Sequence, residues 1–172
     1  MLIADEFVND EISVSLEELR DYINKNLNDL IEEVRKVIDE AGVEKVAYFL
    51  DSAQSYFLAT IDGNKPKVRP FGTVLVYDGK LYIQTGKSKD VSKQIAANPM
   101  VELCAFKDGT WLRLSGELVN DDNREVKEAM LTKYPSLKGM YSADDDNTQV
   151  LYFKDSTATF SSFTSEPEVI KL

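Results

Sequence analysis

The 172-residue sequence contains no histidine and only one cysteine. Without histidine it cannot form a Ser-His-Asp or Cys-His triad, an imidazole-ligated haem or a histidine-ligated metal site. One cysteine cannot form an intramolecular disulfide or a thiolate cluster. No apolar run approaches the roughly 20 residues that a membrane-spanning helix needs. The acidic start Met1–Glu6 also lacks the basic residues of a signal peptide. We therefore expect a soluble, cytoplasmic protein.

Positive charge is scarce as well, and it is unevenly distributed. The chain has 30 acidic and 20 basic residues, a net charge of -10, which disfavours general binding to DNA or anionic membranes. Residues 65–93 reverse this balance, with seven basic residues (Lys65, Lys67, Arg69, Lys80, Lys87, Lys89, Lys93) and two acidic ones. This basic stretch indicates either a local anion site or solvated lysines that protect hairpin edges from aggregation.

The N-terminal part of the chain has the pattern of a long amphipathic helix. Ser15 and Glu18 form a capping box. Apolar residues recur from there at steps of three and four (Leu16, Leu19, Ile23, Leu27, Leu30, Val34, Val37, Ala41). Gly42 is predicted to end this helix, and a second short helix is predicted over residues 43–53. The narrow, heptad-like stripe could pack on the rest of the protein or pair with another chain.

From Tyr56 onward the sequence pattern becomes that of β-strands. Three Asp-Gly pairs, at residues 62–63, 78–79 and 108–109, separate β-type runs and predict three hairpins. Short helices are predicted near residues 90–97 and 121–134, and a last hairpin is predicted from residues 150–154 and 157–163. The predicted fold is mainly β: a small antiparallel β-barrel with the N-terminal helices appended to it.

Three segments are candidates for a binding site, and each also has a purely structural interpretation. Pro70 and Gly72 predict either a strand edge open to a ligand or a bulge that bends the strand. Residues 85–90 lead from a strand into a helix, so their amides, hydroxyls and lysines could hold a phosphate or simply cap the helix. Trp111 and Arg113 share one strand face, which suits a flat anionic ligand, a subunit contact or a half-exposed tryptophan beside a flexible arginine.

Five segments in this order carry a family resemblance: FLAT at 57–60, KVRPFG at 67–72, LYIQTG at 81–86, Lys89 through NPMV at 98–101, and WLRLSG at 111–116. Together, from about Val46 to Leu172, they resemble the FMN-binding split-barrel superfamily, the pyridoxamine 5'-phosphate oxidase-like proteins. The resemblance implies a six-stranded antiparallel split β-barrel with flanking helices, formed by residues 46–172. Residues 1–45 would be an N-terminal helical extension.

The resemblance also implies a homodimer with FMN in two clefts between the subunits. It places the FMN phosphate near Arg69, Thr85, Ser88 and Lys89, with Gln94 nearby. The backbone of Arg69, Pro70, Phe71 and Gly72 would line the isoalloxazine ring, and Trp111 and Arg113 would approach it from the same chain or from the partner.

The sequence departs from the oxidase itself in two places. The Ser-Arg-Lys run that follows the threonine there is replaced by Lys89-Asp90-Val91, and the C-terminal substrate motif with arginine and histidine is missing. We therefore do not expect oxidation of pyridoxamine phosphate. The leading hypothesis is an FMN-dependent oxidoreductase with an unidentified substrate and no assignable acid or base. The rival hypotheses are a flavin-binding or flavin-sensing protein without turnover, a flavin-free interaction module, and use of a deazaflavin.

Overall fold

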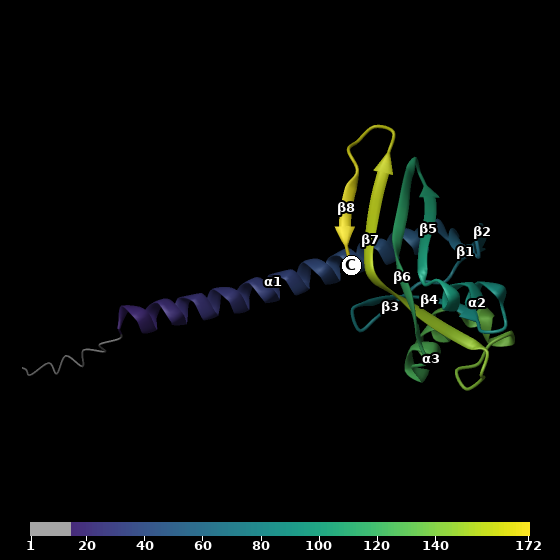
Figure 1. Ribbon diagram of the computed structural model, residues 1–172, viewed down its shortest axis with the longest axis horizontal. Coiled ribbons are helices and arrows are strands. Elements are labelled where there is room, and N and C mark those ends of the chain that lie inside the picture. Colours follow the sequence, from purple (N-terminus) through teal and green to yellow (C-terminus); the bar gives the residue numbers. More distant parts are fainter. Residues whose placement is uncertain (1–14) are drawn as a thin grey trace, which may run out of the picture. The chain divides into compact units, whose positions relative to one another are not determined.

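The computed structural model describes residues 15–172. Residues 56–171 fold around one antiparallel sheet (Figure 1). The acidic start Met1–Glu6 lies outside the described residues. The helices are α1 (Leu16–Ala53), α2 (Asp90–Ala97), α3 (Arg124–Lys133) and the 3-10 helix η1 (Pro135–Gly139). The strands are β1 (Tyr56–Asp62), β2 (Lys65–Phe71), β3 (Leu75–Tyr77), β4 (Lys80–Gly86), β5 (Met100–Lys107), β6 (Thr110–Asp121), β7 (Thr148–Ser162) and β8 (Glu168–Lys171). The chain divides into two compact units, residues 1–37 and 38–172.

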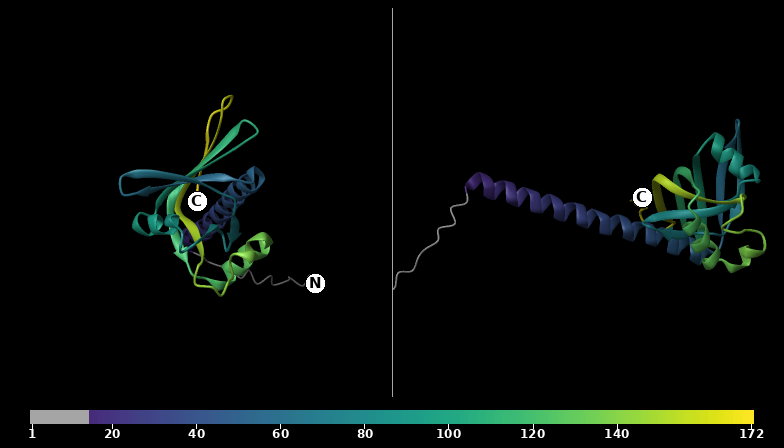
Figure 2. Two further views of the ribbon diagram at one scale, coloured as in Figure 1. Left: turned by 90° about the vertical axis from the view of Figure 1, so that its right-hand side faces the viewer. Right: turned by 90° about the horizontal axis from the view of Figure 1, so that it is seen from below.

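The sheet has the order β2-β1-β5-β6-β7-β4-β3, with β8 added to β7, and every pair of neighbours is antiparallel. Figure 2 gives two further views of the ribbon. The mainly β, antiparallel fold is confirmed. The described residues form eight strands, whereas six were expected. The difference arises because β3 is separated from β2 by residues 72–74, and because residues 168–171 pair with β7.

The three Asp-Gly hairpins are confirmed. They join β1 to β2, β3 to β4 and β5 to β6. Gly63, Gly79 and Gly109 have φ angles of 62°, 70° and 80°, and Asp78 and Asp108 precede the last two with φ angles of 48° and 49°. A two-residue turn with both φ angles positive matches the twist of the strands that it joins, and Asp-Gly is a dipeptide that the last two turns favour. In the first hairpin Asp62 is the last residue of β1 and pairs with Lys65, so the turn residues are Gly63 and Asn64.

The prediction of a hairpin from residues 150–154 and 157–163 is wrong, because residues of both segments belong to the single strand β7. This strand pairs with β4 through its first third and with β6 along most of its length. Asp155 bends it with a φ of 47°, near a register shift between Ser115 and Glu117. A Cβ on Gly116 would lie 2.5 Å from the Cβ of Ser156. The bend in β7, visible in Figure 1, therefore depends on close backbone packing and not on a turn sequence.

The capping box of α1 is confirmed, but the predicted end of the helix is wrong. The Ser15 amide donates to Glu18 Oε2 at 2.9 Å, and the Glu18 amide donates to Ser15 Oγ at 3.1 Å. The helix then continues through Gly42 to Ala53. Gly42 is buried, and a Cβ there would lie 2.7 Å from Cγ2 of Ile170. This glycine therefore allows close packing and does not act as a helix terminator.

The main core lies between the end of α1 and the inward side of the sheet. Val43, Val46, Ala47 and Leu50 of α1 are buried in it. The strands contribute side chains that solvent does not reach, among them Leu58, Ile83, Leu103, Leu112 and Leu114. A smaller cluster beneath α3 contains Tyr82, Val126, Met130 and Val150. In the described part of the chain, no helix is long and apolar enough to span a membrane.

Candidate functional site

Arg69 is held in place by neutral groups from β1 and α2. Its Nη1 donates to Thr60 Oγ1 at 2.6 Å and to the Leu58 carbonyl at 3.1 Å, and its Nη2 donates to Gln94 Oε1 at 2.7 Å. The Thr60 hydroxyl donates to the same Gln94 oxygen at 2.6 Å. Partial burial lowers the pKa of the Arg69 guanidinium from its ordinary value, yet an arginine stays charged in proteins. The group is therefore a fixed positive charge with uncharged partners.

The basic stretch of residues 65–93 separates into two kinds of residue. Lys67, Lys87 and Lys93 lie 3.8, 3.0 and 3.3 Å from the carboxylates of Asp62, Asp122 and Asp90. Within residues 15–172, the other four bases have no carboxylate within ion-pair distance. Two of them, Lys65 and Lys80, are exposed at the starts of β2 and β4. Arg69 instead has neutral partners, and Lys89 Nζ lies 5.7 Å from the ring centroid of Tyr141. Besides the two exposed hairpin lysines, positive charge thus remains available at Arg69 and Lys89, which are on different elements.

Arg69 and Lys89 line the same cavity, which has a volume of about 220 Å³. Six of the ten predicted site residues line it: Arg69, Pro70, Phe71, Gly72, Thr85 and Lys89. Gln94 is joined to it through its hydrogen bond to Arg69. The remaining wall comes from Thr73, Gln84, Val91, Leu137, Met140 and Tyr141. Strand β2, the β4–α2 corner and the segment after α3 therefore converge on one hollow.

The β4–α2 corner is closed by Asn147, a residue that the sequence does not mark as part of a site. The Lys87 amide donates to the Asn147 carbonyl at 2.7 Å, and the Ser88 amide donates to Asn147 Oδ1 at 2.9 Å. The Lys89 amide donates to the carbonyl of Gly86 at 3.0 Å. These three amides, which the sequence suggested as phosphate donors, already have partners. Side chains are therefore the main polar groups that the corner offers to a ligand.

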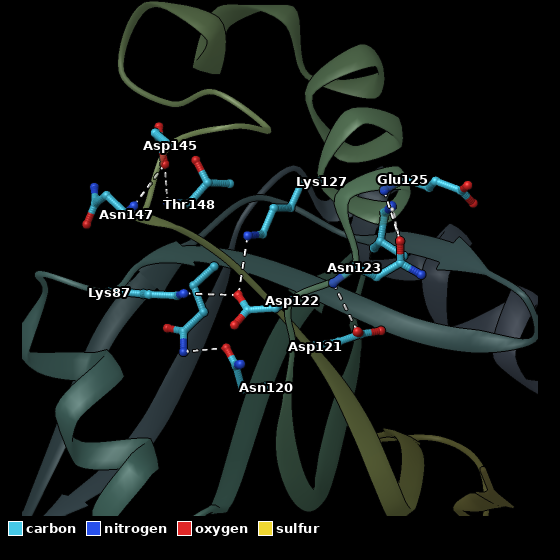
Figure 3. A network of polar contacts seen from close by, with 12 residues as sticks. Lys87, Asn120, Asp121, Asp122, Asn123, Glu125, Lys127, Asp145, Asn147 and Thr148 are labelled. Atoms are coloured by element: carbon cyan, nitrogen blue, oxygen red, sulfur yellow. Dashed lines mark hydrogen bonds and ion pairs between the residues drawn. The ribbon is translucent and has the colours of Figure 1, made fainter.

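A polar network fixes this corner relative to α3 (Figure 3). Asp122 lies 3.0 Å from Lys87 Nζ and 3.3 Å from Lys127 Nζ, and the hydrogen bond from Lys87 is the main reason that the pKa of Asp122 is lowered. Asp145 accepts hydrogen bonds from the amides of Asn147 and Thr148. The network therefore connects Lys87, at the corner, with the start of α3, and it holds the loop that carries Asn147.

Trp111 and Arg113 lie elsewhere in this chain, on the outward side of β6. Arg113 forms a bidentate ion pair with Glu102, with two hydrogen bonds of 2.8 Å. This contact raises the pKa of the guanidinium. The ring centroids of Trp111 and Phe163 are 5.2 Å apart. The predicted alternation is correct, since Leu112 on the other side is fully buried. Neither Trp111 nor Arg113 lines the cavity of its own chain.

The sheet presents an apolar outer face around Arg113. Phe57 of β1 pairs in register with Cys104 of β5, and Cys104 pairs with Arg113. Phe57 is 54% exposed and Phe106 is 63% exposed. Val68 and Met100 on the same side are exposed as well. We call the side chains of Phe57, Val68, Met100, Cys104, Phe106, Trp111 and Arg113 the outer face.

Three other hollows are larger, but none of them is lined by an unpaired base of the basic stretch. One, of about 420 Å³, lies among α1, β6, β7 and β8, where Lys45 is paired with Glu168. A second, of about 430 Å³, lies beside α3 and is lined by the acidic residues Glu128 and Asp144, which both pair with Arg124. The third, of about 310 Å³, is lined by Lys93 together with its partner Asp90. The smaller cavity at Arg69 is therefore the better candidate for an anionic ligand.

Comparison with known proteins connects this arrangement to a family. The chain is 43% identical to a nimc/nima family protein from Clostridium acetobutylicum, with a TM-score of 0.76, covering 80% of this chain and 96% of that one. The fold is shared by General Stress Protein 26 from Bacillus anthracis (20% identity, TM-score 0.60, 76% and 98% covered). It is also shared by a pyridoxamine 5'-phosphate oxidase-related, FMN binding protein from Nostoc punctiforme (14% identity, TM-score 0.54, 77% and 95% covered).

A search among curated proteins found no match. The sequence profile of the pyridoxamine 5'-phosphate oxidase family, in contrast, matches residues 43–160, which include every predicted site residue. The resemblance inferred from the ordered motifs is thus confirmed, and the chain belongs to the pyridoxamine 5'-phosphate oxidase family.

Proposed function

We propose that this protein is an FMN-binding flavoprotein that acts as a homodimer and transfers electrons to or from a small-molecule substrate. The observation that carries the proposal is the convergence of Arg69 and Lys89 on one cavity without a carboxylate partner. In a chain of net charge -10, two such cations make a local exception to the repulsion that an anion otherwise meets.

The cavity fits the phosphate of a flavin through its side chains. Arg69 offers a planar guanidinium, which suits phosphate geometry. Lys89 offers a second positive charge, and Thr85 offers a hydroxyl in the same wall. Each hydrogen bond from a charged donor contributes about 1.5–3 kcal/mol. Ser88, at the same corner, is proposed as a further contact, and Gln94 orients Arg69. No binding of nucleic acid and no resident metal are proposed.

A homodimer is proposed because one chain offers too little enclosure for a whole flavin. Ligand pockets of drug size usually enclose about 300–1,000 Å³, whereas this cavity has about 220 Å³. The outer face has the exposed aromatic side chains and the arginine that are enriched at subunit contacts. In this arrangement the partner subunit would bring the isoalloxazine contacts, including Trp111 and Arg113, that the cavity lacks within its own chain.

When FMN is bound, its ring supplies the redox chemistry, while the protein supplies binding, orientation and electrostatics. The backbone of Pro70, Phe71 and Gly72 is proposed to lie along the ring. No residue is assigned as an acid or a base. A cytoplasmic location is part of the proposal. The second candidate function, a flavin-binding protein without turnover, uses the same contacts.

Binding is tested by titrating the purified protein with FMN and with riboflavin while following flavin fluorescence. Arg69→Ala and Lys89→Ala are expected to weaken FMN binding roughly tenfold to hundredfold each and to leave riboflavin binding little changed, because riboflavin has no phosphate. Lys93→Ala is the matched control, since it removes a lysine that is paired with Asp90 on the same short helix. If the protein does not bind FMN, or if Lys93→Ala weakens binding as much as Lys89→Ala does, the proposal fails.

Turnover is tested on the flavin-loaded protein under anaerobic conditions. Bleaching of the flavin band by a nicotinamide donor, followed by reoxidation with an added acceptor, would support the oxidoreductase. A flavin that stays oxidised with every nicotinamide donor and common acceptor would favour the binding or sensing function instead.

A further inference from the structure

The first part of α1 carries large apolar side chains that solvent reaches. Between residues 16 and 37 the exposed fraction of these side chains runs from 39% at Ile31 to 87% at Leu16. We call seven of them the α1 stripe: Leu16, Leu19, Ile23, Leu27, Leu30, Val34 and Val37. Single exposed apolar residues are common on proteins, but a continuous row is typical of a contact surface.

The spacing of the α1 stripe is that of a coiled coil. Leu16, Ile23, Leu30 and Val37 follow one another at intervals of seven, and Leu27 and Val34 form a second series four residues after Ile23 and Leu30. An average step of 3.5 residues keeps an apolar seam facing one partner helix as the two supercoil.

The polar residues of the same segment agree with a helical partner of identical sequence. Glu32 lies on the side opposite the stripe and pairs with Arg35. Asn24, Asn26 and Ile31, which flank the middle of the stripe, carry no charge, and the charged neighbours Arg20 and Glu33 lie toward its two ends. Two copies of this helix can therefore approach along their stripes without bringing like charges together at the centre.

A partner would also stabilise the helix. The segment of 22 residues from 16 to 37 is about 33 Å long, and most of the stability of helices in proteins comes from packing of their apolar face. With roughly 100 Å² for each fully exposed aliphatic side chain, the stripe offers about 400 Å² on each helix. Two helices would bury about 800 Å² of apolar surface, which is below the roughly 1,000 Å² of a stable specific interface and is typical of a weak one. The pairing is therefore expected to depend on protein concentration.

We propose that the α1 stripe is the seam of a two-stranded coiled coil with the same stripe of a second copy of this chain. The family profile begins at residue 43, so this contact is a property that the chain adds to the family domain. It does not depend on whether flavin binds.

The proposal is tested by cross-linking in the full-length chain. Cys104→Ser removes the native thiol, and Leu27→Cys or Glu32→Cys then introduces one thiol on α1. Leu27 lies near the middle of the stripe, so its two copies stay close whether the helices run parallel or antiparallel. A short bis-maleimide is expected to convert most of the Leu27→Cys protein to a covalent dimer and little of the Glu32→Cys protein. Equal cross-linking of both variants, or of neither, would overturn the proposal.

A second measurement uses charge instead of a cross-linker. Leu27→Glu places a negative charge in the seam, and Asn28→Glu places the same charge outside it. Far-ultraviolet circular dichroism of the full chain is expected to show concentration-dependent helix content for the wild type and Asn28→Glu. Leu27→Glu is expected to lose helix signal equivalent to at most roughly 20 residues, because the unpaired segment loses the packing of its apolar face. Equal helix content in all three proteins at every concentration would contradict the coiled coil.

Discussion

Gln94→Glu is predicted to stabilise the free protein and to weaken FMN binding. Gln94 Oε1 accepts hydrogen bonds from Arg69 Nη2 at 2.7 Å and from the Thr60 hydroxyl at 2.6 Å. Glutamate has nearly the same shape and keeps both contacts, but its oxygen is charged. The substitution therefore gives Arg69 the carboxylate that it lacks in the wild type, and it adds an anion beside the proposed phosphate site.

The two effects have opposite signs and can be estimated. A hydrogen bond to a charged group contributes about 1 kcal/mol more than one between neutral groups, which raises the melting temperature of a chain of this size by about 2–4 °C. Two anions that contact one guanidinium lie about 6 Å apart, and unit charges at that distance repel by about 3 kcal/mol at an effective dielectric constant of 20. Partial solvent screening reduces this repulsion, so we expect FMN affinity to fall tenfold to hundredfold.

The assay measures thermal unfolding without ligand, and then the dissociation constants of FMN and riboflavin, for the wild type, Gln94→Glu and Gln94→Met. Riboflavin binding should be unchanged in Gln94→Glu. Methionine keeps the size of the side chain but accepts no comparable hydrogen bond, so Gln94→Met should lose stability and lose less FMN affinity than Gln94→Glu. The reasoning is refuted if Gln94→Glu binds FMN as tightly as the wild type, or if it loses riboflavin affinity to the same extent.

Three further predictions concern other parts of the molecule. Phe57→Glu, in the outer face, should convert the proposed dimer to a monomer in light scattering when it is combined with Leu27→Glu, which removes the α1 contact, and it should reduce flavin retention. A mass unchanged from that of Leu27→Glu alone would argue against this interface. Gly116→Val should destabilise the protein by about 1–3 kcal/mol in denaturant titrations, because its Cβ would collide with the opposite strand, while Gly139→Ala, with open space around it, should have little effect. Asp122→Asn should lower stability at neutral pH by less than about 1 kcal/mol. Since its native pKa lies below the usual 3.8, this deficit should be complete above about pH 4 and disappear as the pH falls through the native pKa.

The parts of the fold that could be predicted from the sequence depend on local chemistry. The Asp-Gly turns require positive φ angles, and only a few residue types adopt them at low cost. The capping box needs two side chains three residues apart, and the predicted contacts are present. Helix α2 has the bounds that its pattern and the following Asn98-Pro99 suggested. In each case the residues that decide the structure are neighbours in the sequence.

The features that could not be predicted depend on residues that are far apart in the sequence. Gly42 and Gly116 are needed because distant residues pack against them, at Ile170 and at Ser156. A glycine that allows close packing cannot be told from one that ends a helix without knowing its spatial neighbours. Asn147 closes the β4–α2 corner from about 60 residues away in the chain, and no local motif marks it.

The basic stretch shows why the candidate site could be only partly predicted. Residues 65–93 contain seven bases and two acids, a pattern that is compatible with an anion site and also with a solvated surface. The structure distinguishes the two interpretations for each residue. Lys87 forms an ion pair with Asp122, whereas Arg69 is hydrogen-bonded to a hydroxyl and a side-chain amide. Neutral partners orient a guanidinium without neutralising its charge. The electrostatic attraction of the site for an anion thus depends on Arg69 having no carboxylate partner. For this reason, the single substitution Gln94→Glu should be enough to weaken that attraction.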